Sequence, residues 1–171
     1  WIQQLTNSLG EVHRLAGRLE QAEKSFHQAL TLADSIPDEG ERERSRGYSY
    51  LGLTKLSLDQ HDLKTASEYC QQAEKLLKHS WMEPEMKRVQ AQLERLSQNW
   101  DEAQAYLTES LAAFERSGED YDRMQVYYEM ALLCQAQGDH QAAQGWFEKT
   151  LQAADNLNNL VMREMIMHSI S

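Results

Sequence analysis

The chain has 171 residues, a length that allows one domain or a compact array of small repeats. Hydrophobic residues make up 41% of it, yet the mean hydropathy is −0.71, which indicates the large polar surface of an elongated repeat array. Two prolines and eight glycines leave little room for a turn-rich all-β fold. The formal net charge of −10 repels duplex nucleic acid, so we do not expect nucleic-acid binding.

Cysteine content and hydropathy predict where the chain resides. Cys70 and Cys134 form no CxxC motif, so we interpret them as buried reduced thiols. No apolar run approaches the roughly 20 residues that span a bilayer, and no signal-peptide pattern opens the chain. We therefore expect a cytoplasmic chain without membrane contact. Its start at Trp1 suggests a fragment, from which a targeting segment could have been removed.

Apolar periodicity predicts helices along the whole chain. In order they cover about 1–16, 18–35, 40–60, 62–79, 83–98, 100–117, 120–137, 139–155 and 158–170. Gly17 and Gly138 stand where a helix end commonly needs a left-handed residue. Asp62 and Asp139 stand where a side chain can cap the next helix.

An internal repeat organises these helices. Four segments align on an alanine, namely Ala22, Ala66, Ala103 and Ala143, with spacings of 44, 37 and 40 residues. Relative to that alanine, positions −12 and +7 are small, and positions −13, −10, −3 and +4 are mostly large and apolar. We expect the small residues to let two helices approach closely and the large ones to fill the remaining core. In the first repeat the large residues at −13 and −10 are Leu9 and Val12.

These residues resemble the tetratricopeptide repeat, a helix–turn–helix unit of about 34 residues. The family pattern is matched by Leu9-Gly10, Gly17, Ala22, Phe26 and Ala29, and again by Met130-Ala131, Gly138, Ala143 and Phe147. Repeats two and three depart from it, with Leu53-Thr54 and Gln90-Ala91 in place of Leu-Gly. The longer spacing is similar to that of kinesin light chains, bacterial peptide-sensing regulators and the sensor arms of signalling ATPases.

The resemblance implies an all-α, right-handed α-solenoid of antiparallel helix pairs. We expect a single domain over 1–171, with repeats at about 1–36, 40–80, 83–117 and 120–156 and a terminal helix at 157–170. The terminal helix carries many apolar residues, so it would pack on the fourth repeat and leave some of them exposed. It could then support self-association, or serve as the first helix of a further repeat.

The resemblance also implies a binding groove lined by the first helix of each repeat. Its members include the predicted binding residues Arg14, Tyr48, Lys55, Arg88, Arg95 and Tyr128, together with Glu11, Leu51, Asp59, Glu85 and Leu132. We expect a protein or peptide partner that carries acidic groups, with a carboxylate held by Arg88 and Arg95. The alternative is that these are ordinary surface residues, or that Tyr48 and Tyr128 pack between repeats.

The sequence lacks motifs that are typical of catalysis or of phosphate and metal binding. It contains no glycine-rich phosphate loop, no HExxH and no nucleophile signature, so we predict no enzymatic activity, no cofactor and no metal. The function that we expect is a protein- or peptide-binding module. The alternative is a sensor or regulatory arm of a larger signalling or transcription-regulating protein.

The alignment of the four segments on these alanines, which we call the repeat frame, can be tested at one of its small positions. We expect Ala103→Leu to lower the free energy of unfolding by about 1–3 kcal/mol, because the larger side chain overpacks a helix crossing. Denaturant unfolding of the two proteins measures the difference. An unchanged transition would contradict the frame.

Overall fold

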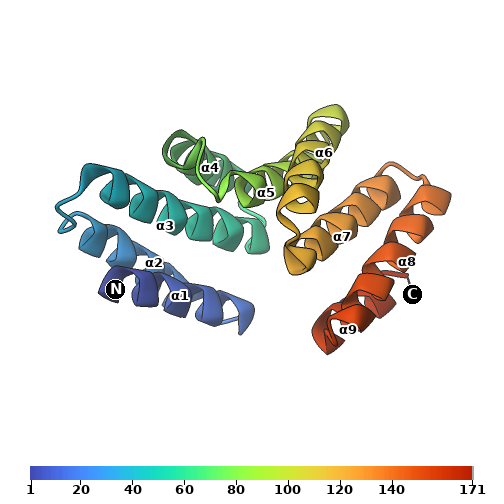
Figure 1. Cartoon of the computed structure of the whole chain (residues 1–171), viewed down its shortest axis with the longest axis horizontal. Coiled ribbons are helices and arrows are strands. Elements are labelled where there is room, and N and C mark those ends of the chain that lie inside the picture. Colours follow the sequence, from blue (N-terminus) through green and yellow to red (C-terminus); the bar gives the residue numbers. More distant parts are fainter. Residues whose placement is uncertain (171) are drawn as a thin grey trace. The chain divides into compact units, whose positions relative to one another are not determined.

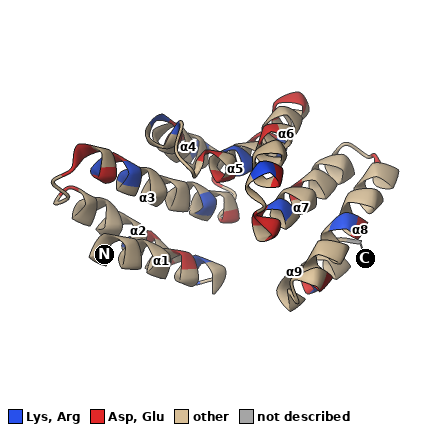
Figure 2. Ribbon diagram, in the orientation of Figure 1, with Lys and Arg blue, Asp and Glu red and all other residues tan. Residues whose placement is uncertain are grey.

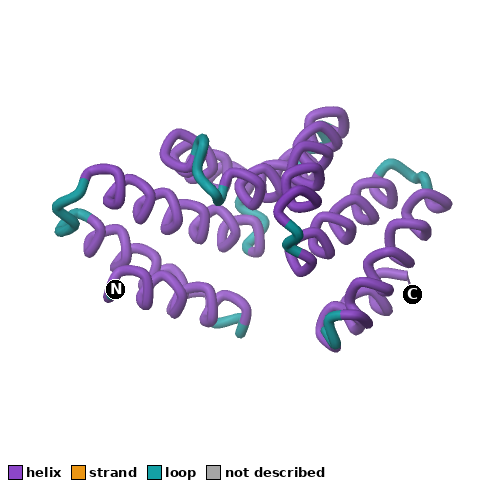
Figure 3. Tube along the Cα trace, in the orientation of Figure 1, coloured by secondary structure: helices purple, strands orange, loops and turns teal. Residues whose placement is uncertain are grey.

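The computed structural model describes residues 1–170, and over these the chain is all-α (Figures 1 and 3). The helices are α1 (Ile2–Leu15), α2 (Leu19–Ala33), α3 (Glu39–Asp59), α4 (Leu63–Leu77), α5 (Glu83–Leu96), α6 (Trp100–Ser117), α7 (Asp120–Ala136), α8 (His140–Asn156) and α9 (Leu160–Ile170). Short loops join them. Each predicted helix is present, with its ends within two residues of those expected from the sequence.

The chain divides into two compact units. The first is Trp1–Val89 and the second is Gln90–Ser171, so the division falls inside α5. In the first unit α1 pairs with α2, α3 pairs with α4, and α3 also contacts α2 and α1. In the second unit α7 contacts both α6 and α8, and α9 packs on α8. The expectation of a single domain stays a prediction.

The repeat frame is confirmed by burial. The four anchor alanines are between 0% and 3% exposed, and the residues at +4 and +7 are also buried. One cluster joins Ala22 and Phe26 of α2 to Leu53 and Leu56 of α3. In repeats two and four, the large residues at −13 and −10 therefore pack on the second helix of the preceding repeat.

Leu9 and Val12 are the exception, and the expectation that they fill the core was wrong. Their side chains are 49% and 54% exposed. The physical reason is that these positions face a preceding second helix, and residues 1–170 contain no helix before α1. No helix of residues 1–170 covers this face, on which Ile2 and Leu5 are also exposed. At −3, His140 is likewise exposed.

The ring of Phe26 lies between two glycines on neighbouring helices. A Cβ built on Gly10 of α1 would lie 2.7 Å from Phe26 Cε1, and one built on Gly52 of α3 would lie 2.3 Å from it. Both distances are far below an ordinary van der Waals contact. The absence of side chains at these two positions therefore lets α1 and α3 close over the ring.

The turn inside each repeat contains one residue in the left-handed backbone conformation. The residue five positions before the anchor alanine has positive φ in all four repeats: Gly17 (71°), His61 (58°), Gln98 (65°) and Gly138 (81°). The glycines were expected there, whereas His61 and Gln98 adopt this conformation at a steric cost. Asp62 and Asp139 cap the helices that follow, because their side chains accept from the Thr65 and Ala142 amides.

Acidic residues gather at helix N-termini, where they favour the positive end of the helix dipole. Glu39 and Glu41 lie in the first turn of α3, and Asp120 and Asp122 lie in that of α7. Both turns are red in Figure 2. Part of the chain's negative charge therefore supports helix ends.

Helix α9 packs as the sequence predicts. Met162 and Ile166 are buried in a cluster with residues of α7 and α8, such as Met124 and Phe147. Leu160 and Val161 are each 69% exposed. Self-association through this helix stays a prediction.

The contact of Phe26 with Gly52 predicts opposite effects for two Gly→Ala replacements. Gly52→Ala should destabilise the fold by about 1–3 kcal/mol, because its Cβ overlaps a buried ring. Gly145→Ala should stabilise it by about 0.5–1 kcal/mol, since Gly145 lies within α8 and nothing lies within 4 Å of its added Cβ. Thermal unfolding compares both variants with the parent chain. Equal shifts would contradict the close approach at Phe26.

Candidate functional site

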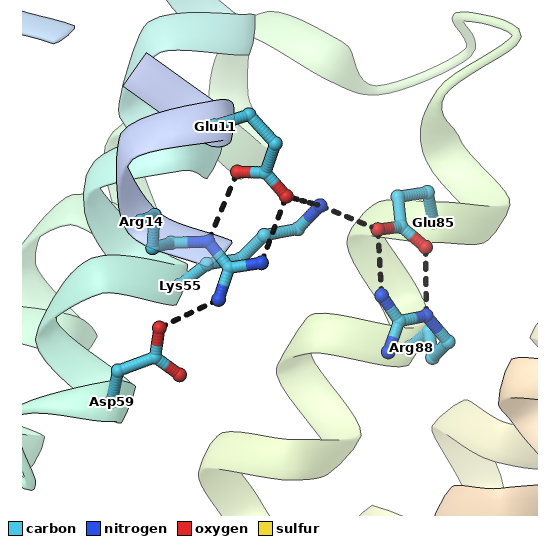
Figure 4. Close-up of polar contacts among 6 residues, drawn as sticks. All are labelled: Glu11, Arg14, Lys55, Asp59, Glu85 and Arg88. Atoms are coloured by element: carbon cyan, nitrogen blue, oxygen red, sulfur yellow. Dashed lines mark hydrogen bonds and ion pairs between the residues drawn. The ribbon is translucent and has the colours of Figure 1, made fainter. Parts of the chain in front are cut away.

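Six charged side chains of the first unit form one continuous network (Figure 4). They come in pairs from the first helices of successive repeats: Glu11 and Arg14 from α1, Lys55 and Asp59 from α3, and Glu85 and Arg88 from α5. All six were expected to line the groove. The structure brings them together as ion pairs.

Arg14 links α1 to α3. Its Nε and Nη2 atoms donate to the two carboxylate oxygens of Glu11, at 3.0 and 2.8 Å. Its Nη1 atom donates to Asp59 Oδ2 at 2.6 Å. A planar guanidinium suits this arrangement, because it presents several N–H donors in fixed directions.

Lys55 links α3 to α5. Its Nζ atom lies 2.7 Å from Glu85 Oε1 and 3.9 Å from Glu11 Oε1. Arg88 holds the same Glu85 carboxylate from α5, with Nη2 and Nε each 2.7 Å from an oxygen. Glu85 therefore accepts from two cations on two helices.

These contacts shift the pKa values of the carboxyl groups. Burial by itself raises the pKa of Glu85, but the charges of Arg88 and Lys55 and their hydrogen bonds hold that pKa well below its ordinary value. For Glu11, burial again raises the pKa, and the contacts with Arg14 and Lys55 outweigh it. Both carboxylates are therefore ionised at neutral pH.

The network has no net charge, because it contains three carboxylates and three cationic side chains. In the second unit, Arg95 donates to Glu129 Oε2 at 3.2 Å. Each of the four predicted cations thus has a carboxylate partner within the chain. Sequence reasoning identified these residues as groove members but not as partners of one another.

A cleft of about 370 Å³ lies beside the network in the first unit. Its walls come from α1, α2, α3 and the turn between α4 and α5. Besides Glu11 and Lys55, it is lined by Gln3, Gln4, Asn7, Ser8, Phe26, Tyr48, Leu51, Gly52, Trp81 and Met82. Since Gly52 has no side chain, it leaves Phe26 within reach of the cleft.

An aromatic pair forms one wall of this cleft. The rings of Tyr48 and Trp81 meet edge to face, with centroids 5.9 Å apart. Trp81 is 73% exposed, whereas Leu51, which was expected on the groove surface, is buried. Sequence reasoning found Tyr48 and missed Trp81, because Trp81 lies in a turn outside the repeat frame.

Two residues of the cleft lining on α1 carry amide side chains whose oxygen atoms are buried. Gln3 Oε1 and Asn7 Oδ1 are buried and have no hydrogen-bond partner within residues 1–170. The two residues are four apart on one helix, so they lie on the same face. A buried acceptor without a partner is uncommon in folded proteins.

Tyr128 of α7 contacts both α8 and α9. Its ring lies 6.1 Å from that of Phe147, and its hydroxyl group is 3.0 Å from Ser169 Oγ of α9. Leu132 packs against the same core cluster. Both residues therefore contribute to packing in the second unit, and the role of Tyr128 in binding stays a prediction.

Over residues 1–170 no three His, Cys, Asp or Glu side chains come together in a way that could hold a metal ion. None of the helices in that range combines the length and apolar character that crossing a membrane requires.

The depressed pKa of Glu85 predicts how one replacement depends on pH. A folded-state pKa below the unfolded one stabilises the fold above the ordinary value of 4.5, and that contribution is lost as the pH falls. Glu85→Gln should therefore cost about 3 kcal/mol at pH 7, because Arg88 and Lys55 lose their shared partner. The difference should shrink below about pH 4.5.

Urea unfolding between pH 3 and pH 7 measures this difference. The control is Glu102→Gln on the exposed face of α6, which should change stability by no more than about 0.5 kcal/mol. A cost of Glu85→Gln that does not vary with pH would contradict the coupling.

Comparison with known proteins agrees with this architecture. A family model described as "MalT-like TPR region" matches residues 3–169. No curated protein matches the chain. The match covers nearly the whole chain and both compact units, so this chain belongs to the MalT-like TPR region family.

Proposed function

We propose that the chain is a peptide-binding module whose ligand occupies the cleft of the first unit. Repeats of this type typically mediate protein interactions, and the chain is a helical repeat module by family and by fold. The observation that carries the proposal is the cleft itself. It lies on the first helices of two successive repeats, and an exposed aromatic ring forms part of its lining.

Trp81 is the strongest candidate for an anchor. Its ring is 73% exposed beside the cleft, so a ligand can still bury most of it. Aromatic side chains that become desolvated at the centre of an interface often dominate its binding energy. Tyr48 supports the ring from α3 and itself lines the cleft.

The predicted cations do not carry ligand binding in this proposal, because each is already paired with a carboxylate. A ligand carboxylate would have to displace Glu85 from Arg88 and Glu129 from Arg95, because those pairs are already formed. Exchange of one carboxylate for another yields little net energy. The proposal therefore rests on the aromatic and amide lining, and Arg14, Lys55 and Arg88 hold α1, α3 and α5 in place around it.

A regulatory role would use the same surface. As a sensor arm of a larger protein, the chain would bind its ligand in this cleft and transmit occupancy to another domain. We propose no reaction for the cleft, since repeats of this family are generally non-catalytic.

The aromatic anchor is tested by Trp81→Ala. Peptides selected from a phage-displayed library on the 171-residue chain serve as probes, and fluorescence anisotropy measures their affinity. Trp81→Ala should weaken binding at least about tenfold, because truncating a central aromatic anchor costs well over 1 kcal/mol. Its melting temperature should stay unchanged, since the ring is largely exposed.

The matched control is Tyr121→Ala. Tyr121 is 52% exposed on α7 and lies outside the cleft lining, so its loss should leave affinity unchanged. The proposal fails if no library peptide binds, or if the selected peptides bind both variants equally well.

A further inference from the structure

We propose that two copies of this chain associate through the outer face of α1, antiparallel and around a two-fold axis that passes beside residue 7. The contact, which we call the α1 seam, consists of Ile2, Leu5, Leu9 and Val12 in each copy. The second copy's α1 then covers the kind of face that α2 covers on α3. None of the four residues lines the cleft, so this inference goes beyond the proposed function and does not depend on it.

The α1 seam has the spacing of paired helices. Its residues stand at positions 2, 5, 9 and 12, so the steps between them are three, four and three residues. Apolar residues at such steps form one stripe, which packs against the same kind of stripe on a neighbouring helix. The order of the steps is identical in both directions, so the stripe is complementary to an antiparallel copy of itself. Ile2 of one copy then meets Val12 of the other, and Leu5 meets Leu9.

The exposed apolar surface of α1 is large enough for a dimer contact. Within the described residues, six apolar side chains are exposed on this helix and its flanking residue: Trp1, Ile2, Leu5, Leu9, Val12 and Leu15. Ile2 and Leu5 are 70% and 68% exposed. Together the six expose on the order of 700 Å², which is close to the roughly 800 Å² that each partner buries in a stable interface.

The distribution of charge favours a second copy at the α1 seam. The chain has a net charge of −10, so two copies repel each other over much of their surface. Glu11 and Arg14 supply the formal charge of α1, and both belong to the ion-pair network with α3. The seam itself is uncharged, and so are Thr6 and Ser8 beside it. Two acidic chains can therefore meet here without bringing like charges together.

The exposed apolar residues of α9 lie among charges instead. Leu160 and Val161 are each 69% exposed, but Arg163 and Glu164 are exposed on the same short helix. Arg163 pairs with Asp155 of α8 at 2.8 Å. A second copy on α9 would have to cover these charged side chains, whereas a second copy on α1 covers apolar ones. We therefore assign the contact to α1.

Sedimentation velocity of the 171-residue chain tests the association. Between about 1 and 200 µM we expect a monomer–dimer equilibrium. The mass should stop at two copies, because a two-fold contact uses the same face on both and closes the assembly. A chain that stays monomeric overturns the inference and leaves the α1 face to a different partner. Growth beyond two copies, which a head-to-tail contact between α1 and α9 would produce, overturns it as well.

Charged replacements locate the contact. Leu5→Glu combined with Leu9→Glu should raise the dimer dissociation constant at least about a hundredfold, because four carboxylates then face one another in the seam. The matched control is Leu160→Glu combined with Val161→Glu, which adds the same charge at equally exposed positions of α9. It should leave the dimer intact. Equal losses in the two double variants would show that net charge decides association, and would overturn the inference.

A rescue experiment separates loss of the contact from loss of the fold. A chain with Leu5→Lys and Leu9→Lys, mixed with the double Glu chain, should form a one-to-one dimer, since the opposite charges meet across the seam. Orientation is read from disulfides: a Leu5→Cys chain mixed with a Leu9→Cys chain should link one of each on oxidation. Charged chains that fail to pair, or disulfides that join only identical chains, would overturn the antiparallel seam.

Discussion

The close approach of α1 and α3 to the ring of Phe26 is the constraint on which the rest of the first unit depends. Gly10 and Gly52 have no side chains to hold the helices apart, and a Cβ at either would overlap the ring. Because two first helices lie this close together, their neighbouring side chains meet. The Arg14–Asp59 ion pair joins these two helices, and both of them line the cleft.

The ion-pair network shows how such packing changes the meaning of charged residues. Arg14, Lys55 and Arg88 look like ligand-binding cations when each is considered along its own helix. In the folded unit they share the carboxylates of Glu11 and Glu85 and connect three first helices. Charge that is satisfied internally connects these helices, and we propose that uncharged groups carry recognition.

Two buried amide oxygens lower the free energy of unfolding. Gln3 and Asn7 each bury an oxygen atom without a partner, and an apolar residue at either position would avoid that penalty. Residues that are unfavourable for stability and line a cleft are a common sign of function. The exposed apolar face of α1, with Leu5 and Leu9, is different in kind, since it continues the core pattern of the repeats onto an uncovered helix.

The sequence by itself determined the helices, their pairing into repeats and the buried small residues, because these depend on local propensity and on a periodicity that recurs four times. It also identified the polar residues of the first helices. Tertiary structure alone decided which of them are partners: Lys55 meets Glu85 across thirty residues, and Tyr128 meets Phe147. The tertiary structure also leaves Leu9 exposed and Leu51 buried. It places Trp81, which lies in a turn, against Tyr48. These outcomes depend on which neighbouring helix covers a position, which no single repeat encodes.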